Sequence, residues 1–542
     1  MATPWGIDGK SRQYIKRTGR IGVQRIHVRN KQAAPLHLDI ADMLSLNLVL
    51  ITLVVALGGF VYGVDSGIIA TTLGHDTFKY TMFGPIGENA GLKGAIVSLY
   101  NVGQALGTFI AGYSANKFSR RWTICGSAVV AIIGAVLQSA AVNAGMMIAG
   151  RFFAGIGCGM LLTVVPIYIA EVSPPHKRGF IVGLQGFMIA IGFCIANWIG
   201  YGGAFAKDDA QWRIPLAMQI PGPLLLVLGC CFIPYSPRWL IQGERYEEAR
   251  AVLTMLQGSE MDEVSLSQEL AQIREQIQAE ATEVTSFQVA CAKLFSRRYL
   301  HRTLIACFIV VMGQFSGSQV IQNYQTSFYE TVGFTGKTSL LISGVYGFMG
   351  VIGQIIYLFV VADKWPRTRT LWTGSLVLSC LIAICMALSA VYGDKSGGDL
   401  SGARAAIAMI FLYSCAYAVF FNAMVWVVPS ELFPFFLRST GLGLAVFGKS
   451  VAAIVLSQIT PTALENVSWK YYSLFIATNF VAAFIYFFFL PETGGKILEQ
   501  IAELFGDPPS ALNTGDKAED MDDGQSIAGT KDTKSAHVEA VV

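Results

Sequence analysis

Long apolar runs recur along the chain, separated by short polar segments, and most are close to the roughly twenty residues that cross the hydrocarbon core of a bilayer. The pattern predicts twelve membrane-spanning helices in two sets. The first set lies at 46–70, 95–115, 122–142, 146–170, 181–201 and 212–233, and the second at 303–325, 340–362, 370–391, 405–429, 440–460 and 471–490. We therefore expect an all-α membrane protein with twelve transmembrane helices in two six-helix halves.

The polar segments divide the chain into five parts. We expect an amino-terminal segment at 1–45, six-helix bundles at 46–235 and 303–490, a linker at 236–302 and a tail at 491–542. The linker contains the amphipathic stretches RYEEARAVLTMLQG and ELAQIREQIQAE, which predict cytoplasmic surface helices rather than a separate folded domain. The tail is rich in Asp, Ser, Gly and Lys, and after about residue 505 it is expected to be disordered.

Composition agrees with this pattern and narrows the function. Hydrophobic residues make up 53% of the chain and charged residues 14%, whereas soluble proteins carry about 25% charged residues. The net charge of +3 gives no reason to expect nucleic acid as a partner. The ten cysteines have no paired spacing and no histidine lies in a long apolar run, so neither disulfides nor a metal site are expected. The sequence shows no nucleophile–base or metal-ligand cluster, which disfavours an enzyme, and no cofactor is expected. The first 45 residues are polar and basic without an apolar core, so no signal peptide is expected.

Lysine and arginine residues near the spans predict the orientation, because cytoplasmic loops carry an excess of both. The amino-terminal segment and the loops that follow even-numbered spans are basic, whereas the loop between the third and fourth spans has no Lys or Arg. Both termini are therefore expected in the cytoplasm. The sequon Asn466-Val467-Ser468 then lies outside, and Asn466 is a candidate for glycosylation.

The two halves repeat short motifs in the same order. EVSPPHKRG follows the fourth span and ELFPFFLRSTG the tenth, and both read E-x-x-P-x-x-x-R. SANKFSRRW after the second span is echoed by VADKWPRTR after the eighth, and IPYSPRW after the sixth by LPETGGK after the twelfth. Because each half has an even number of spans, the halves are parallel repeats, as in transporters that rock one half against the other around a central site.

The charges in these repeated loops predict a gate at the cytoplasmic face. An arginine fork pairs well with a carboxylate, and such a pair would hold the helices of a bundle together while the inner side is closed. The candidates are Glu171, Arg178, Glu431 and Arg438, with Arg121 and Arg367 as their partners.

Three longer motifs carry a resemblance to a known family. GRFFAGIGCGMLLTVVPIYIAEVSPPHKRG resembles the fourth-span signature of the sugar porter family, PYSPRWL its PESPRWL motif, and LPETGGKILEQI its PETKGxxLEE ending. Over roughly residues 45–505 the chain thus resembles the sugar porters of the major facilitator superfamily, particularly the fungal branch. The resemblance implies the major facilitator fold and the transport of a small solute by alternating access.

Several positions depart from the pattern of that family. GYSANKFSRR stands where the family reads GxxxDRxGRR, so that Asn116 replaces an aspartate and Ser119 a glycine. The seventh span reads GQFSGSQVIQNY, with one glutamine, the asparagine and one tyrosine of the family motif lost. The tenth span reads NAMVW, which keeps Trp426 but lacks the Gly-Pro of the family's GPxxW motif. These departures leave the solute open.

A polyhydroxylated solute needs uncharged donors and acceptors together with an aromatic face. Amides offer both a donor and an acceptor, and the resemblance places Gln185, Gln314 and Trp426 on sugar-contacting positions. The substrate-binding candidates are Gln185, Gln314, Gln319, Asn323 and Trp426. The alternative is that these amides only hold helices together, which is worth about 0.6 kcal/mol each in a membrane.

Two charges inside the spans predict coupling to protons. Asp65 lies within the apolar run GGFVYGVDSGII, and Arg151 lies near the start of the fourth span. A carboxylate that pairs with an arginine in one state and faces water in another can bind and release a proton. Proton-coupled sugar porters resemble this chain at the first-span GYDxG motif, so Asp65 is the predicted coupling residue and Arg151 its partner. Lys449 in the eleventh span is a further charge that a long side chain could carry to the inner surface, and we assign it no role.

The sequence thus predicts a monomeric, multi-pass transporter of the plasma membrane whose partners are a small-molecule substrate, a proton and the lipid bilayer. Its substrate is expected to be a sugar or a similar polyhydroxylated solute, moved as a proton symporter. Two alternatives stay open at this point. The protein could carry a polyol, a quinate-like acid or a secondary metabolite, or it could be a nutrient sensor that does not transport.

Overall fold

The computed structural model describes most of the chain as helices. The described residues are 46–84, 89–173, 178–257, 287–330, 334–362, 364–392, 400–433, 435–493, residue 505 and short pieces at 266–267, 270–271 and 273–274. All regular elements in these ranges are helical, as predicted. The amino-terminal segment and most of the tail lie outside the described residues.

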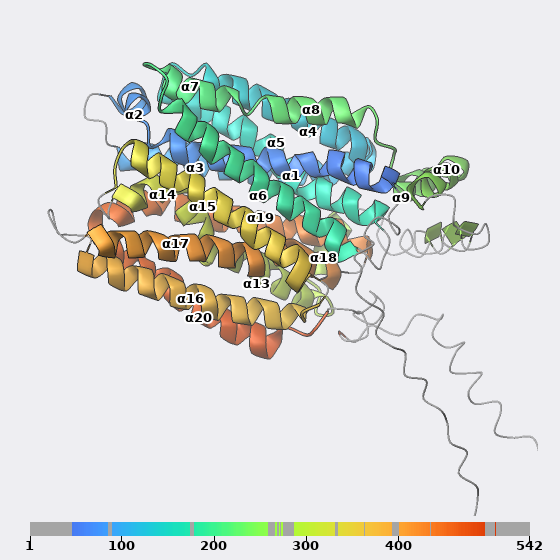
Figure 1. The fold of residues 1–542 in the computed structure, drawn as a ribbon. Coiled ribbons are helices and arrows are strands. Elements are labelled where there is room, and N and C mark those ends of the chain that lie inside the picture. The colour runs from blue at the N-terminus through green and yellow to red at the C-terminus, as the bar shows by residue number, and fades with distance from the viewer. Residues whose placement is uncertain are drawn as a thin grey trace, which may run out of the picture. The chain divides into compact units, whose positions relative to one another are not determined.

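The first predicted set of six spans is present (Figure 1). The sixth span consists of two shorter helices, because Pro221 and Pro223 cannot donate backbone hydrogen bonds and therefore start a new helix. A short helix, α2 (Asp76–Phe83), follows the first span. The spans are α1 (Leu46–Thr72), α3 (Ala90–Lys117), α4 (Arg120–Ser139), α5 (Ala144–Val172), α6 (Arg178–Gly203), and α7 (Ala210–Ala217) with α8 (Pro221–Cys230).

The second set is also present, with more interruptions. Two of its spans are broken into pairs of helices, and one ends in a turn of π-helix, η3 (Tyr357–Val361). The spans are α13 (Leu300–Phe315) with α14 (Ser318–Glu330), α15 (Lys337–Ile356) with η3, α16 (Arg367–Tyr392), α17 (Leu400–Phe420) with α18 (Met424–Leu432), α19 (Phe435–Val467) and α20 (Tyr472–Phe489).

The number of membrane passes follows from helix length. The described residues contain eleven helical stretches that are long and apolar enough to cross a membrane, and the last of them covers 50 residues, Thr440–Phe489. At about 1.5 Å per residue such a stretch would measure ~75 Å, more than twice the ~30 Å hydrocarbon core. It is divided by the short 3₁₀ helix η4 (Ser468–Tyr471), where Ser468 has a φ of 46°. It therefore makes two passes, and the total is twelve.

Polar caps begin several spans. Asn89 accepts a hydrogen bond from the Leu92 N–H at 3.0 Å, and Asn143 accepts one from the Met146 N–H at 2.8 Å. Each of these side chains satisfies an amide that the first helical turn leaves without a partner. The caps place the starts of α3 and α5 at the polar ends of the apolar runs.

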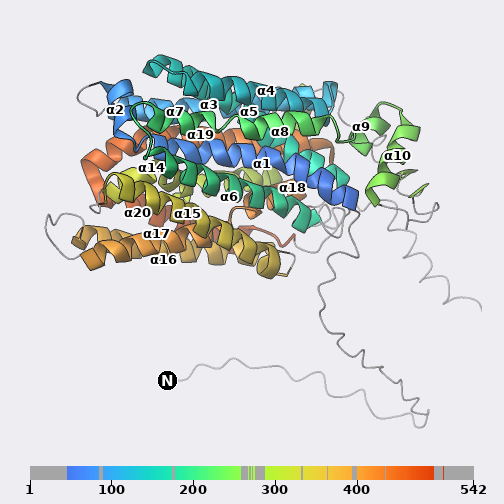
Figure 2. The same ribbon diagram turned by 45° about the horizontal axis from the view of Figure 1, so that its top comes forward.

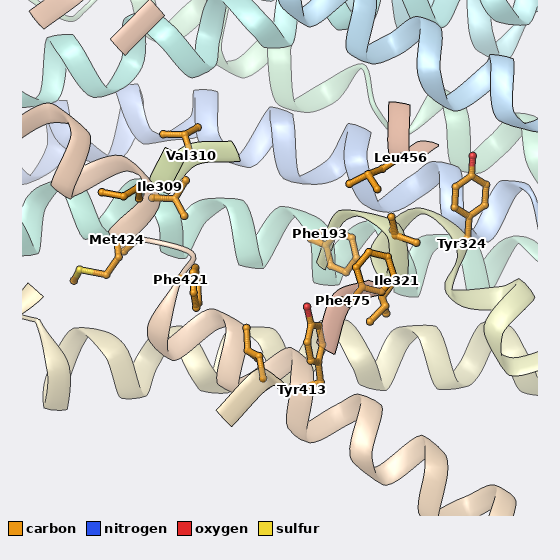
Figure 3. Packing of buried hydrophobic residues seen from close by; sticks show 14 of the residues in the cluster. Phe193, Ile309, Val310, Ile321, Tyr324, Tyr413, Phe421, Met424, Leu456 and Phe475 are labelled. Carbon is orange, nitrogen blue, oxygen red and sulfur yellow. The ribbon is translucent and has the colours of Figure 1, made fainter. Parts of the chain in front are cut away.

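The two halves meet along two equivalent seams. α3, from the second span, packs against α19 from the eleventh, and α15, from the eighth span, packs against α6 from the fifth. Exchanging the halves converts one seam into the other, as expected for parallel repeats. α1 also contacts α14 between them. A continuous apolar core, which includes Phe193, Tyr413 and Phe475, lies between these helices (Figure 3).

Glycines bring α1 and α6 into close contact beside the seams. Gly59, Gly63 and Gly67 recur every four residues on α1 and face the α6 backbone. A Cβ on Gly67 would lie 2.9 Å from the Phe193 carbonyl oxygen, nearer than a side-chain carbon can pack. Small residues at this spacing let transmembrane helices approach closely. Gly63 also reaches the central cavity described below.

The linker forms helices at one end of the bundle. α9 (Pro237–Gln242) and α10 (Tyr246–Gln257) lie beside the first turn of α1, where Asn47 donates a hydrogen bond to the Met255 carbonyl (Figures 1 and 2). α10 matches the first predicted amphipathic helix. The second predicted helix is mostly outside the described residues, and α12 (Phe287–Leu294) precedes the seventh span.

Candidate functional site: a central cavity, a buried ion pair and two gate clusters

A cavity lies between the two halves. Its volume is about 80 Å³, and its lining comes from α1 and α6 on one side and from α13, α14, α15, α17, α18 and α19 on the other. The side chains are mainly uncharged amides, hydroxyls and aromatic rings. The polar and aromatic members are Tyr62, Ser66, Phe193, Gln314, Gln319, Gln322, Tyr346, Ser414, Tyr417, Asn422, Trp426 and Lys449.

Breaks in two helices present most of these groups. The seventh span is interrupted at Gly317, whose φ of 95° is a conformation that side chains rarely adopt. A Cβ there would also lie 2.9 Å from the Phe475 ring. The break leaves Gln314 at the end of α13 and Gln319 at the start of α14, both on the cavity wall. Interrupted helices at the centre of a transporter are typical of a binding site.

The tenth span is interrupted without the family's Gly-Pro. α17 ends at Phe420 and α18 begins at Met424, and the N–H groups of Phe421 and Asn422 both bond to the Tyr417 carbonyl. The Asn422 side chain donates to Gln354 Oε1 at 3.0 Å and to the Gly186 carbonyl at 3.2 Å. Asn422 therefore holds the break against α15 and α6, and the loss of Gly-Pro has not straightened the helix.

Three of the five predicted substrate-binding residues line the cavity, and two do not. Gln314, Gln319 and Trp426 are on its wall, whereas Gln185 and Asn323 are buried outside it. Gln185 packs beside Gly59 of α1, and neither polar atom of its amide has a hydrogen-bond partner among the described residues. All five residues belong to helices that bound the cavity, but the sequence could not give the rotation of each helix, and their binding of a solute stays a prediction.

Lys449 is a cavity residue that sequence reasoning left without a role. It is 4% exposed and lies near the middle of α19, so it does not reach the inner surface as its length had suggested. Its Nζ donates to the Tyr62 hydroxyl at 3.4 Å and lies 5.3 Å from the Tyr62 ring centre and 5.9 Å from that of Trp426. Tyr62 belongs to the other half, so this contact crosses the cavity.

The buried ion pair predicted for proton coupling is formed. Arg151 Nη1 donates to Asp65 Oδ1 at 3.1 Å, and both side chains are almost fully buried. The Cys158 thiol lies 3.7 Å from Asp65 Oδ2, and the guanidinium stacks 4.2 Å from the centre of the Tyr100 ring. Asp65 is not on the cavity wall, but Ser66 beside it and Tyr62 one turn earlier are. The geometry places a titratable carboxyl within the first half, next to the wall; its role in coupling stays a prediction.

The first gate cluster corrects one predicted partner. Glu171 is bound by Arg120, with Oε1 at 2.9 Å from Nη2 and 3.2 Å from Nε, and Ser236 donates to its other oxygen. Arg121, the predicted partner, turns away: it donates to the Cys231 carbonyl and stacks over the Tyr235 ring. Successive residues of a helix point about 100° apart, so only one of two adjacent arginines can face Glu171.

The second gate cluster repeats the first. Arg367 Nη2 lies 3.6 Å from Glu431 Oε1, and Thr493 donates to Glu431 Oε2 at 2.9 Å. In the repeated motifs Arg120 corresponds to Arg367, Glu171 to Glu431 and Ser236 to Thr493. Each half therefore has one arginine, one glutamate and one hydroxyl in a single cluster. The side chains of Arg178 and Arg438 lie outside the described part of the structure.

Ser119 carries backbone strain next to the first gate cluster. It stands at the family's glycine position, is fully buried, and has φ 81° and ψ 159°. That region of backbone space is essentially reserved for glycine and costs a side chain ~1–3 kcal/mol. Its Oγ accepts a long hydrogen bond, 3.4 Å, from the Trp122 N–H at the start of α4, so a cap offsets part of the strain.

The glycosylation candidate lies at the end of a helix. Asn466 is exposed in the last turn of α19, and its amide nitrogen donates to the Thr462 carbonyl at 2.9 Å. Its modification stays a prediction.

Known proteins resemble this chain over most of its length. The family model "Sugar (and other) transporter" matches residues 51–505. An MFS-type transporter of Aspergillus cristatus, criB, is 34% identical, with 86% of this chain and 95% of the relative covered. A quinate permease of Neurospora terricola is 32% identical (82% and 86% covered), and a high-affinity glucose transporter of Kluyveromyces lactis is 28% identical (86% and 87% covered).

A solved structure has the same fold. The proton:xylose symporter XylE, bound to 6-bromo-6-deoxy-D-glucose, superposes with a TM-score of 0.73 at 24% identity, covering 84% of this chain and 99% of that one. The chain therefore belongs to the Sugar (and other) transporter family, the sugar porters of the major facilitator superfamily, and is a multi-pass membrane transporter.

Proposed function

We propose that the protein is a secondary active transporter that moves a sugar or sugar-like polyhydroxylated solute by alternating access, as a proton symporter. One observation carries the proposal: a cavity between the two halves is lined by amides of the second half and by aromatic rings of both halves. Amides bind hydroxyls as donor and acceptor at once, and an aromatic face covers the C–H surface of such a solute. Relatives named for the transport of glucose and of quinate support this solute class.

Within the cavity the residues have distinct roles. Gln314, Gln319 and Gln322 lie around the break in the seventh span and would bind the hydroxyl groups. Trp426 offers the aromatic face. Gln185, whose amide atoms have no hydrogen-bond partner among the described residues, would join the site when the halves rock, because it lies just beyond the wall on α6.

Proton coupling would act through the Asp65–Arg151 pair. While Asp65 is ionised, Arg151 stabilises the carboxylate inside the first half. Protonation removes that attraction, so the pair would separate and α1, which also carries the wall residues Tyr62 and Ser66, would be free to shift. Binding of the solute and binding of the proton would thereby favour the same rearrangement.

We propose further that both termini and the gate clusters face the cytoplasm of a plasma-membrane carrier that acts as a monomer. The basic loops predict this orientation. The gate clusters lie at the same end of the bundle as α9 and α10, because Ser236 directly precedes α9.

Uptake measurements test the proposed function. The full-length protein is expressed in cells that lack their own sugar transporters, and labelled hexoses, pentoses, disaccharides, polyols and quinate are offered in turn. We expect saturable accumulation of at least one of them, abolished by a protonophore. If none is accumulated although the protein reaches the plasma membrane, the proposed function is wrong.

A further inference from the structure

We infer that the transported solute is an anion: a polyhydroxylated carboxylate whose negative group binds Lys449 in the central cavity. This inference rests on the proposed function and narrows its substrate class. It starts from the position of Lys449, which lies within a transmembrane helix, is 4% exposed and is part of the cavity wall. An ionisable residue at that depth is energetically costly, and such residues usually mark the pathway of a substrate or ion.

The surroundings of Lys449 do not neutralise its charge. The described residues that line the cavity include no aspartate or glutamate. Asp65 is paired with Arg151 at 3.1 Å, and the described residues place no carboxylate oxygen within ion-pair distance of Lys449. Its contacts are instead the Tyr62 hydroxyl and the faces of Tyr62 and Trp426. Aromatic faces stabilise a cation but leave its charge in place.

The hydrogen-bonding capacity of Lys449 points the same way. An ammonium group has three donors, and the bond to Tyr62 at 3.4 Å accounts for one of them. A ligand carboxylate could accept the other two and would supply the missing negative charge. Hydrogen bonds between two charged groups are roughly twice as strong as those between neutral ones, so the site should discriminate strongly between an acid and a neutral analogue of the same shape.

The uncharged part of the cavity wall suits the hydroxyl groups and carbon skeleton of such a solute. Gln314, Gln319 and Gln322 come from the seventh span, across the cavity from the first half, and carry no charge. They would bind hydroxyl groups, while Trp426 lies close enough to Lys449 to cover the carbon skeleton next to the carboxylate. The cavity wall thus combines one cation with uncharged amides and an aromatic ring, which matches a hydroxy acid better than a neutral sugar.

Matched pairs of probes test the inference on the purified, full-length protein. We would measure the protection of the wild type against thermal unfolding by quinate and its methyl ester, and by glucuronate and glucose, at one pH and ionic strength. We expect the acid to bind at least tenfold more tightly than its neutral partner in one pair or both. If neither acid binds more tightly than its partner, the inference is wrong.

Variants then assign the preference to Lys449. Lys449→Gln should reduce the acid-to-neutral ratio to within about twofold while the neutral probe still binds, and Lys449→Arg should keep the preference. Lys93→Gln serves as the control, because Lys93 lies on α3 with its Nζ 2.7 Å from Ser327 Oγ and is not on the cavity wall. A preference that survives Lys449→Gln would overturn the inference. Should Lys449→Gln not fold, Lys449→Arg decides: loss of the preference there contradicts a role for the charge.

The outcomes separate this inference from the proposed function. If the wild type binds and accumulates glucose better than either acid, it is still a transporter of polyhydroxylated solutes, and only the anionic substrate is wrong. If no probe binds and no solute of the uptake panel is accumulated, the proposed function fails as well.

Discussion

At the scale of single residues, Ser119 shows how one side chain can oppose the fold that surrounds it. Its backbone lies in a glycine region, at φ 81°, although the serine also caps α4. Ser119→Gly should therefore stabilise the protein by about 1 kcal/mol, because relief of strain exceeds the loss of a 3.4 Å cap bond. Thermal unfolding of the purified protein measures this.

Ser119→Ala is the matched control for that prediction, since it removes the cap but keeps the Cβ in the strained conformation. The expected order of melting temperature is Ser119→Gly above wild type above Ser119→Ala. A melting temperature for Ser119→Gly at or below that of Ser119→Ala would show that the strain is not there.

Asp65 is the residue on which coupling is predicted to depend. Asp65→Asn keeps nearly the same shape but cannot change its charge, so the side chain stays in the neutral form of the cycle. We expect uphill accumulation to fall to equilibration, while exchange of labelled for unlabelled solute continues within about threefold of the wild-type rate.

Asp76→Asn is the control for Asp65→Asn, because Asp76 is a highly exposed carboxylate at the start of α2. It should accumulate solute like the wild type. Protonophore-sensitive accumulation by Asp65→Asn would exclude Asp65 as the coupling residue, and a wild type that only equilibrates its solute would make the protein a facilitator.

The residue types of the candidate site could be predicted from the sequence, but the direction in which each side chain points could not. Gln314, Gln319 and Trp426, which were predicted to bind the substrate, lie on the cavity wall, and their binding of a solute stays a prediction. Gln185 lies on a helix that bounds the cavity but faces α1, because the glycines of α1 draw α6 close and fix its rotation. The position of Lys449 depends on Tyr62, which is 387 residues away in the chain, so no local pattern could show that it stays in the cavity.

At the scale of helices and loops, the role of the first gate cluster can be tested by comparing variants of the adjacent residues Arg120 and Arg121. Arg120→Gln removes the cation bound to Glu171 and should lower the transport rate severalfold with little change in solute affinity, since the cluster lies away from the cavity. Arg121→Gln should stay within about twofold of wild type, because Arg121 contacts a carbonyl and an aromatic ring instead. Rates of uptake at saturating solute measure both.

A charge exchange strengthens the gate prediction. The double variant Arg120→Glu with Glu171→Arg should recover part of the rate lost in either single variant, since it restores an opposite pair at the same place. Equal effects of Arg120→Gln and Arg121→Gln would contradict the assignment of Arg120 as the gate residue.

The elements themselves could largely be predicted. Twelve apolar runs correspond to twelve passes, and the amphipathic period of the linker matches α10. The breaks in the seventh and tenth spans were harder to place. The break at Gly317 depends on packing against Phe475 of α20, and the break before α18 depends on Asn422 reaching Gln354 of α15. Such contacts join distant spans and leave no trace in local hydropathy.

At the scale of the whole molecule, two charged centres lie in different halves. The Asp65–Arg151 pair belongs to the first half and Lys449 to the second. If the solute is a monovalent anion that travels with one proton, each cycle moves no net charge. In proteoliposomes, a pH difference alone should then drive accumulation of the acid probe, and a potassium diffusion potential alone should not. Accumulation driven by the potential would mean that each cycle carries more protons than negative charges.

A cycle that moves no net charge also determines in which surroundings such a carrier would be useful. A hydroxy acid loses its charge near the pKa of an ordinary carboxyl group, about 4, and below that pH it would no longer match Lys449. Above neutrality few protons are available outside the cell. Between those limits, each pH unit by which the surroundings are more acidic than the cytoplasm permits up to a tenfold higher internal concentration of the acid. This ratio does not depend on the membrane potential. A cell with such a carrier could therefore collect acids from acidic surroundings even when its membrane potential has collapsed.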